Sequence, residues 1–281
     1  MGFEHMFGRG FYIGSLFIAW YGVIIAAAIL VAFLIGSYLY KLKDYRDDIP
    51  YQILLTMVPI AIIGSRLTYI IFYPGTNFFD FRGGGLTIYG AIGFAVLALL
   101  VYARFRKVGF FTLCDGIVVG LILAQAIGRW GNFTNQELYG WEVGFNFFPL
   151  TVNINGSNHL ALFFIESVLN IAGFVFLFWF FTRKQKKFGT TTALYFIWYG
   201  TVRAILEHFR TPESITLIGN NDIVINRVFF LVSLLLIAVG CVILYLNKRG
   251  LINQENGGVK AQKKTKQGKG ETDARIDSDE I

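Results

Sequence analysis

The sequence predicts an all-α integral membrane protein with seven transmembrane helices, and three observations support this fold class. Of its 281 residues, 55% are hydrophobic and 15% are charged, whereas a water-soluble domain carries about a quarter charged residues. Several apolar runs reach the roughly 20 residues that a helix needs to cross about 30 Å of hydrocarbon. The lysines and arginines gather in alternate connections between these runs.

The apolar runs set the expected order of the helices along the chain. No basic stretch with a short apolar segment and a cleavage site opens the sequence, so we expect the first run to be retained as a span. The seven spans are expected at about 12–36, 52–73, 86–104, 111–130, 159–182, 189–206 and 226–247. They form a single transmembrane domain over residues 1–250.

Two further segments differ from the spans in composition. Residues 131–158 are too long and too polar for a simple turn, and we interpret them as a head outside the membrane. Residues 251–281 are rich in charged and small polar residues, so we expect a disordered cytoplasmic tail.

The positive charges predict the orientation of the spans. One side of the membrane would hold eighteen lysines and arginines and the other side six, with one more, Arg66, inside the second span. Positively charged loops stay in the cytoplasm, which places the N-terminus outside and the C-terminus inside. The eighteen are Lys41, Lys43, Arg46, Arg104, Arg106, Lys107, Arg183, Lys184, Lys186, Lys187 and eight residues after position 247.

Composition also excludes several classes of partner and cofactor. The net charge of +7 is explained by the basic cytoplasmic edge, and the apolar runs leave no basic face for nucleic acid. Cys114 and Cys241 lie far apart without a histidine cluster, so neither a disulfide nor a zinc site is indicated. We expect no metal and no cofactor, and the lipid bilayer is the expected surrounding.

Ionisable groups are costly at membrane depth, so those within or beside the spans are candidates for a functional site. On the predicted topology, four segments that are far apart in sequence bring polar groups to one level near the outer leaflet. They are Arg66, the stretch from Gly83, Gly84 and Gly85 to Tyr89, the stretch from Gly128 to Asn132 with Arg129, and the group Tyr199, Arg203, Glu207 and Arg210.

The last of these groups is spaced so that it forms one stripe on a helix. If the helix continues that far, spacings of four, four and three place Tyr199, Arg203, Glu207 and Arg210 on the same face. An Arg203–Glu207 ion pair that only satisfies itself would explain two of them. With Arg129 and Arg66 at similar depth, however, the cations outnumber Glu207 and Glu137. An anionic ligand would supply the missing charge, and the planar guanidinium suits a phosphate.

Two glycine-containing segments support the same interpretation to different degrees. Gly83, Gly84 and Gly85 would let a backbone approach a lipid headgroup, although a flexible loop before a helix is at least as good an explanation. The run from Gly128 to Gly140 combines Arg129, Asn132, Asn135 and Glu137 where an apolar helix meets water. A helix C-cap would explain only Gly131 and Asn132.

This run resembles the signature of the prolipoprotein diacylglyceryl transferase family, Gly-Arg-x-Gly-Asn-Phe-x-Asn-x-Glu-x-x-Gly, at every fixed position. The resemblance covers about residues 10–248, and the family has seven helices with the N-terminus outside. Other blocks follow in the family's order: Trp20-Tyr21-Gly22, Gly64 to Leu67, Gly84 to Gly90, and Tyr199-Gly200 with Arg203 and Glu207.

The resemblance implies an enzyme of the bacterial cell membrane with its active site towards the outer leaflet. Such enzymes transfer the diacylglyceryl group of phosphatidylglycerol to the lipobox cysteine in the signal peptide of a prolipoprotein, forming a thioether and releasing sn-glycerol 1-phosphate. The implied catalytic residues are Arg129, Arg203, Glu137, Tyr89 and Asn132. The implied lipid-binding residues are Arg129, Arg203, Tyr21, Arg66, Gly84, Gly85, Asn135, Gly140, Tyr199, Glu207 and Arg210.

The chain departs from the family pattern at two positions. Some members have a histidine where this chain has Tyr89, so a catalytic histidine is not carried over. The block His-Pro-Thr-x-Leu-Tyr-Glu is only echoed between His159 and Glu166, which leaves His159 without an assigned role. The base that accepts the thiol proton therefore remains open among Glu137, Glu207, Tyr89 and His208, or a positive site favours the thiolate without a strong base.

Two other classes of function also explain buried charges. A transporter or channel is one, but the charges lie near one face and we find no inverted repeat. A lipid-binding scaffold is the other, and it would need the arginines without the asparagines and glutamates. Turnover of phosphatidylglycerol by the purified protein separates the three classes.

The charge bias predicts that residues 131–158 are external and that Lys184 to Lys187 are cytoplasmic. Cysteines introduced at Phe145 and Lys186 test this prediction with an impermeant thiol reagent on intact cells. We expect labelling at position 145 and protection at position 186. Labelling at 186 but not at 145 would reverse the orientation.

Overall fold

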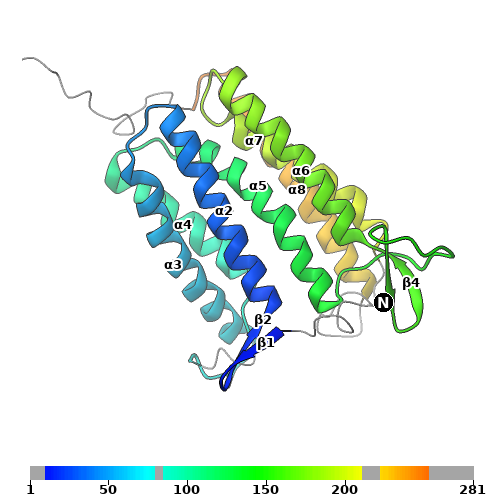
Figure 1. Cartoon of the computed structure of the whole chain (residues 1–281). Coiled ribbons are helices and arrows are strands. Elements are labelled where there is room, and N and C mark those ends of the chain that lie inside the picture. Colours follow the sequence, from blue (N-terminus) through cyan, green and yellow to red (C-terminus); the bar gives the residue numbers. More distant parts are fainter. Residues whose placement is uncertain (1–9, 80–84, 211–221, 253–281) are drawn as a thin grey trace, which may run out of the picture.

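A computed structural model describes residues 10–79, 85–210 and 222–252, which form a bundle of long helices with two short β-hairpins (Figure 1). The predicted disordered tail lies almost entirely outside the described residues. The helices are α2 (Trp20–Leu42), α3 (Asp48–Phe72), α4 (Ile88–Arg106), α5 (Phe110–Asn135), α6 (Leu162–Trp179), which continues as a π-helical segment (Phe180–Lys184), α7 (Thr190–Glu207) and α8 (Asp222–Lys248).

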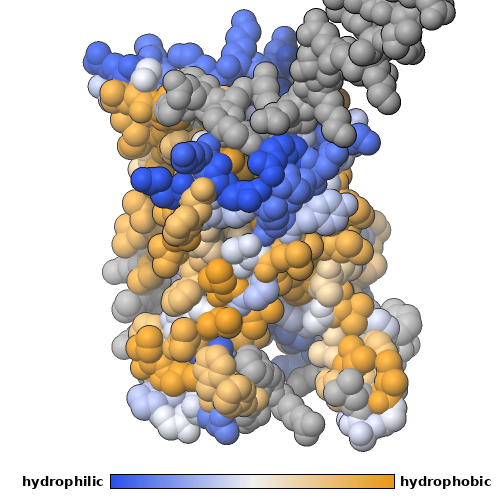
Figure 2. Space-filling model, turned by 90° about the vertical axis from the view of Figure 1, so that its left-hand side faces the viewer, coloured by the Kyte–Doolittle hydropathy of each residue, from blue (hydrophilic) through white to orange (hydrophobic). Residues whose placement is uncertain are grey.

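Six of the helices in the described part of the chain are long and apolar enough to cross a membrane: α2 to α6, and α8 from Val228. Figure 2 shows the hydrophobic surface along one side of the bundle, with hydrophilic residues gathered mainly towards its upper end. The α7 helix is not among the six, and it packs against α5, α6 and α8. A helix that is covered by protein on several sides can keep polar residues at membrane depth.

The predicted span 12–36 is wrong at its N-terminal end, because residues 10–19 form a hairpin. Strand β1 (Gly10–Ile13) pairs antiparallel with β2 (Leu16–Ala19), with Phe11 opposite Ile18. The two-residue loop between them begins with Gly14 at φ +61°, as tight hairpins require. Aromatic and β-branched side chains pair well across strands, which explains why this apolar stretch is not helical.

The predicted head at 131–158 needs a correction at both ends. Helix α5 continues to Asn135, and a second hairpin, β3 (Thr151–Ile154) with β4 (Ser157–Leu160), delays the start of α6 to Leu162. Two residues of this hairpin, Val152 and Ile154, form a small buried apolar cluster with Ala161 and Phe163. The head is therefore an ordered structure, and its pairing explains why residues 159–161 do not belong to the helix.

Helix α5 lies at the centre of the bundle and packs against α2, α6 and α7. Near its N-terminus, the fully buried Asp115 accepts hydrogen bonds from the backbone N–H of Gly189 at 2.7 Å and of Thr192 at 2.8 Å. The Thr192 hydroxyl donates a third bond at 2.7 Å, and Gln185 donates a fourth. A carboxylate at a helix N-terminus satisfies the free amides of the first turn. Asp115 thus fixes where α7 begins.

We expect Asp115→Asn to destabilise the bundle, because an amide keeps the shape but loses the charge and one acceptor. Charge-assisted hydrogen bonds are stronger than neutral ones, so the loss should be about 2 kcal/mol. The matched control is Asp47→Asn at the start of α3, where the exposed aspartate makes no capping hydrogen bond. Thermal unfolding in detergent measures the effect, and equal melting temperatures for the two variants would contradict it.

Candidate functional site

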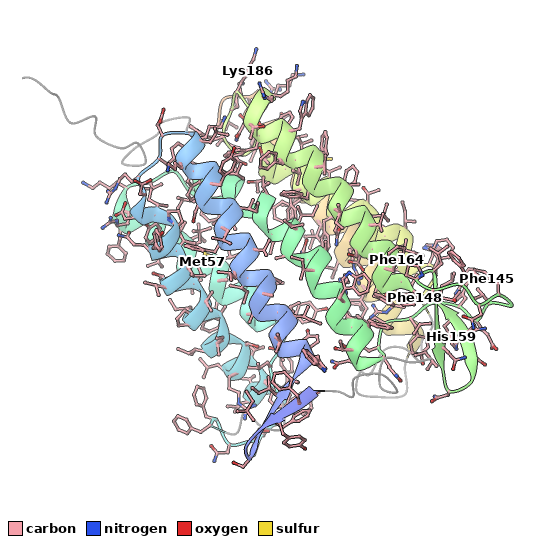
Figure 3. The ribbon with its side chains drawn as sticks, in the orientation of Figure 1. Met57, Phe145, Phe148, His159, Phe164 and Lys186 are labelled. Carbon is pink, nitrogen blue, oxygen red and sulfur yellow. The ribbon has the colours of Figure 1, made fainter. Side chains whose placement is uncertain are left out.

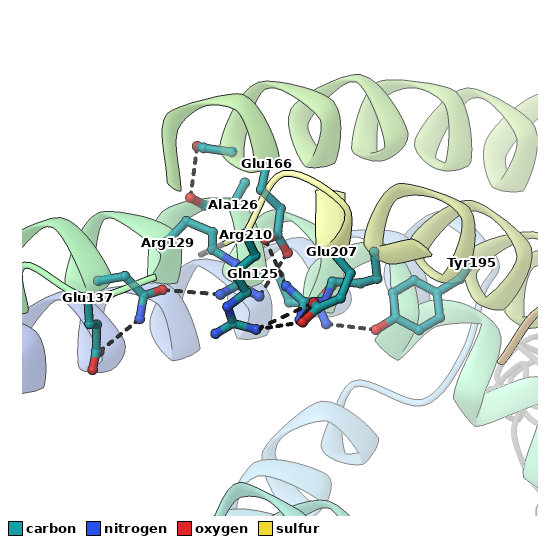
Figure 4. Close-up of polar contacts among 11 residues, drawn as sticks. Gln125, Ala126, Arg129, Glu137, Glu166, Tyr195, Glu207 and Arg210 are labelled. Carbon is teal, nitrogen blue, oxygen red and sulfur yellow. Dashed lines mark hydrogen bonds and ion pairs between the residues drawn. The ribbon is translucent and has the colours of Figure 1, made fainter. Parts of the chain in front are cut away.

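A chain of ion pairs joins α5, α6 and α7 at the end of α5 that is opposite Asp115 (Figure 4). The Glu166 carboxylate in the first turns of α6 pairs with Arg129 Nη2 at 2.8 Å and with Arg203 Nη1 at 3.2 Å. Arg203 Nη2 then pairs with Glu207 Oε2 at 3.2 Å, and Glu207 Oε1 pairs with Arg210 Nη1 at 3.3 Å. Arg129 of α5, Arg203 of α7 and Arg210 thus share two carboxylates. Helix α7 ends at Glu207, so the predicted helical stripe does not extend to Arg210, which lies three residues beyond the helix.

At the C-terminus of α5, side-chain amides extend the chain of ion pairs by hydrogen bonds. Gln136 adopts a left-handed conformation at φ +53°, which ends the helix and turns the chain back. Glu137 consequently accepts hydrogen bonds from Asn132 Nδ2 at 2.9 Å and from Asn135 Nδ2 at 3.3 Å. The side-chain oxygen Oδ1 of Asn132 accepts a hydrogen bond from Arg129 Nη1 at 3.2 Å. The spacing of these residues in the sequence therefore reflects one connected network at the helix end.

The burial of the charged groups differs between the acids and the bases. The side chains of Glu166 and Glu207 are 4% and 3% exposed, whereas those of Arg129 and Arg203 are each 17% exposed. The carboxylates therefore hold the guanidinium groups from the protein side, and other edges of the guanidiniums stay accessible. Breaking such a buried pair leaves a charge without compensation, which is costly in free energy.

Arg210 completes the cluster under less favourable electrostatic conditions. Burial lowers the pKa of Arg210, the Glu207 carboxylate opposes this effect, and the nearby positive charges of Arg203 and Arg129 lower the pKa further. Arginine still keeps its proton at physiological pH. Within the described residues, the Arg210 Nε atom is buried and has no hydrogen-bond partner. The cluster thus retains a donor that an additional anion can satisfy.

Two hollows lie beside these residues. The first is a small polar cavity lined by Arg129, Asn132, Leu138, Leu162, Phe163, Glu166, Arg203, Leu206, Glu207 and Arg210. The second is an apolar groove of about 340 Å³ between α2, α5 and α6, lined by Trp20, Val23, Ile24, Ala27, Leu123, Ala126, Ile127, Trp130, Ser167 and Ile171. Adjacent residues of α5 and of α6 line the two hollows: Arg129 and Glu166 line the cavity, and Trp130 and Ser167 line the groove.

Three tyrosines that the sequence singled out lie around the ion pairs. Tyr199 lies close enough to Arg129 for the two side chains to interact electrostatically. The ring of Tyr21 packs against Gly131 of α5, where a Cβ atom would lie 2.8 Å from it, and the charges of Glu137 and Arg129 act on its hydroxyl. Tyr89, at the start of α4, is 58% exposed and lies within reach of the charges of Arg203 and Arg210.

Arg66 and Gly85 lie in a different environment. The Arg66 side chain is 1% exposed, and its guanidinium donates to the backbone carbonyl oxygens of Phe78 at 3.0 Å, Gly85 at 2.9 Å and Asn77. These bonds fasten the connection between α3 and α4, and Arg66 is not among the residues lining the polar cavity. Gly84 lies outside the described residues.

Gly140 connects the head to the end of α7. It forms a β-bridge with Arg210, and a Cβ atom at this position would lie 2.8 Å from the carbonyl oxygen of Phe209. Only glycine therefore permits this close approach of the two backbones. The His159 ring lies 3.0 Å from the Gly140 carbonyl oxygen, which gives this histidine a position in the head.

Glu166 is the functional candidate that the sequence analysis did not select. It is the only acidic residue between positions 159 and 182, and ionisable residues inside an apolar helix are candidates by themselves. That signal was present in the sequence. The sequence could not show that Glu166 pairs with Arg129 and Arg203, because one arginine lies 37 residues before it and the other 37 residues after it.

Comparisons with known proteins show which family the chain resembles. The model of a family described as prolipoprotein diacylglyceryl transferase matches residues 10–246. A protein of Listeria innocua is 33% identical over 246 residues, covering 82% of this chain and 87% of the relative. One of Clostridium kluyveri is 36% identical over 216 residues (72% and 84%), and one of Streptococcus uberis is 35% identical over 251 residues (84% and 93%). All three are named phosphatidylglycerol–prolipoprotein diacylglyceryl transferase.

We expect Glu166→Gln to lower the melting temperature of the purified protein, because two largely buried guanidinium groups lose their shared counter-charge. Removing one partner of a buried ion pair costs about 3–5 kcal/mol. Glu142→Gln in the exposed part of the head is the matched control and should leave the melting temperature unchanged. If the two variants unfold at the same temperature, Glu166 does not hold the arginines together.

Proposed function

The chain belongs to the prolipoprotein diacylglyceryl transferase family, and from this we propose how its residues carry out the reaction of that family. It is a membrane enzyme of lipoprotein maturation that transfers the diacylglyceryl group of phosphatidylglycerol to a prolipoprotein. The acceptor is the lipobox cysteine. Its sulfur forms a bond to the glyceryl carbon, the bond from that carbon to the phosphate oxygen breaks, and sn-glycerol 1-phosphate leaves.

Arg129 and Arg203 act as the phosphate clamp in this proposal. The observation that carries it is their common attachment to Glu166, which turns two guanidinium groups from different helices towards one cavity. Negative charge grows on the departing phosphate as the carbon–oxygen bond breaks. Donors that are already oriented towards this charge stabilise the transition state more than the bound substrate.

Arg210 and the surrounding tyrosines assist the clamp. The unsatisfied Nε donor of Arg210 is available to a phosphate or glycerol oxygen. Tyr21, Tyr89 and Tyr199 supply hydroxyls for the headgroup, and Asn132 and Asn135 orient the glycerol hydroxyls or the lipobox backbone. In this proposal Gly84 and Gly85 approach the headgroup through their backbone, and Arg66 acts indirectly by holding the carbonyl oxygen of Gly85. The apolar groove beside Trp20 and Trp130 offers a place for an acyl chain next to the clamp.

The thiol of the substrate must lose its proton before it attacks. Glu166 and Glu207 are neutralised by arginines, whereas Glu137 takes part in no ion pair within the described residues. Its carboxylate is oriented by the amides of Asn132 and Asn135. We assign Glu137 the role of proton acceptor, together with a positive site that favours the thiolate.

The enzyme crosses the bacterial cell membrane seven times in this proposal, with α7 as the seventh span, and its site faces the outer leaflet. The positive charge bias towards one end supports this orientation. Lys186 lies at one end of the helices, whereas His159 and Phe145 lie at the other end, in the head (Figure 3). The same domain, residues 1–250, contains both the spans and the site.

We expect Arg129→Lys and Arg203→Lys to lose most of their activity although the charge is kept. An ammonium group cannot donate two parallel hydrogen bonds, and the lost contact removes about 2–4 kcal/mol of transition-state stabilisation. Arg104→Lys at the exposed end of α4 is the control and should stay active. Complementation of a transferase-deficient strain at low expression measures the effect. Full complementation by both site variants would disprove the clamp.

The role of Tyr89 is tested separately from that of Glu137. We expect Tyr89→Phe to cost about 1 kcal/mol, and at most about 3 kcal/mol, because only a hydrogen bond to the headgroup is lost. Glu137→Gln should be slower and should change the dependence of rate on pH. The measurement is the initial rate against pH with a lipobox peptide and phosphatidylglycerol in detergent. A Tyr89→Phe enzyme slower by more than about a thousandfold, with Glu137→Gln near normal, would make the tyrosine the base.

A further inference from the structure

The head carries an exposed aromatic patch that takes no part in the ion-pair chain. We define the patch as Trp141, Phe145, Phe147, Phe148 and Leu150, whose exposed fractions lie between 39% and 61%. A soluble surface rarely gathers so many large apolar side chains within ten residues. Such a patch indicates contact with an apolar partner or with a membrane.

The patch is held in a fixed shape. The Phe148 ring lies 6.0 Å from the ring of Phe133 in α5, and the Trp141 ring lies 5.3 Å from Phe209 after α7. The backbone N–H of Phe147 donates to Thr151 Oγ1 at 2.8 Å, at the start of β3. The exposed rings are therefore presented by a structured segment that is fastened to two helices.

The position of the patch favours the membrane surface as its partner. Figure 1 shows the head projecting sideways beyond α6 at the level where the helices end, and Figure 3 shows Phe145 at its far side. Beyond the edge of a bundle that spans a bilayer, this level is the lipid interface. Aromatic side chains are enriched at this depth in membrane proteins.

The patch also continues the lipid-facing surface of the bundle. Phe148 contacts Phe133, and the Phe133 ring lies 6.3 Å from Trp130, which borders the apolar groove and is 37% exposed. Between positions 141 and 160 the head has one carboxylate, Glu142, and no lysine or arginine. Attraction to anionic headgroups therefore cannot hold the head at the membrane surface. The hydrophobic effect, through insertion of the apolar side chains, is the remaining contribution.

We propose that the aromatic patch inserts into the headgroup interface of the outer leaflet, at a depth where a water-soluble thiol reagent still reaches position 145, and anchors the head at a fixed height over the ion-pair chain. The anchor acts on the site through Gly140, whose backbone is paired with Arg210. It depends on the chain lying in a membrane, and it does not depend on the transfer reaction. The turn of the β3–β4 hairpin points away from the helix ends (Figure 1) and remains in water.

The depth of two positions in the head tests the anchor. Phe147→Cys and the matched Ser157→Cys, beside the hairpin turn, are each labelled with the fluorophore NBD in a Cys241→Ser background, since Cys114 is buried. The full chain is placed in nanodiscs of phosphatidylglycerol and phosphatidylcholine. We expect the label at position 147 to show blue-shifted emission and to be quenched more by shallow spin-labelled lipid than by iodide. The label at position 157 should show no blue shift and should be quenched more by iodide.

Two results would overturn the proposal. Equal quenching of both labels by iodide would place the whole head in water. If the label at position 147 becomes protected from iodide only after a lipobox peptide is added, the patch binds the protein substrate instead of the membrane.

A second measurement does not rely on the label. Phe145→Ser combined with Phe147→Ser should lower the transfer rate in nanodiscs and leave it unchanged in detergent, where no interface has to be matched. Phe105→Ser, at an 81% exposed position at the opposite end of α4, is the control and should have no such split. An equal loss of rate in both media would contradict the anchor, and the depth measurement remains valid even for an inactive protein.

Discussion

The site depends on one carboxylate, Glu166, which holds arginines from two neighbouring helices. Without it, Arg129 on α5 and Arg203 on α7 would repel each other in a poorly hydrated region. Glu207 repeats this arrangement one step further by joining Arg203 to Arg210. The glutamates are buried and the arginines are partly accessible, so the positive groups are fixed in place before any substrate arrives. An anion site requires this arrangement, in which the acidic groups are buried and the positive groups face the ligand.

The rest of the fold keeps these helices in register. Asp115 binds the first amides of α7 near the N-terminal end of α5, and the ion pairs join the same two helices at their other ends. The α7 helix is thus fastened at both ends, although it is the least apolar of the long helices. The head adds a third connection, because Gly140 pairs with the backbone of Arg210. Polar residues inside the bundle therefore hold the helices in register as well as forming the candidate site.

Much of this could be predicted from the sequence, and the failures have physical causes. Apolar runs located the helices within a few residues, because membrane thickness fixes their length. Residues 12–19 were misassigned, since apolar content alone does not separate a hairpin from a helix. Spacing correctly grouped Tyr199, Arg203 and Glu207 on one helix, but it could not show that Glu166 pairs with Arg129 across helices. Arg66 seemed equivalent to the other arginines, and only the carbonyl oxygens around it distinguish its environment.

The most direct test of the central claim is the structure of the full chain in nanodiscs, determined with bound phosphatidylglycerol. We predict that the lipid phosphate lies within hydrogen-bond distance, about 3 Å, of the guanidinium groups of Arg129 and Arg203. Glu166 should still contact at least one of them from the protein side. A phosphate bound elsewhere, with both arginines still paired only to glutamates, would contradict the claim that the ion-pair chain is the phosphate site.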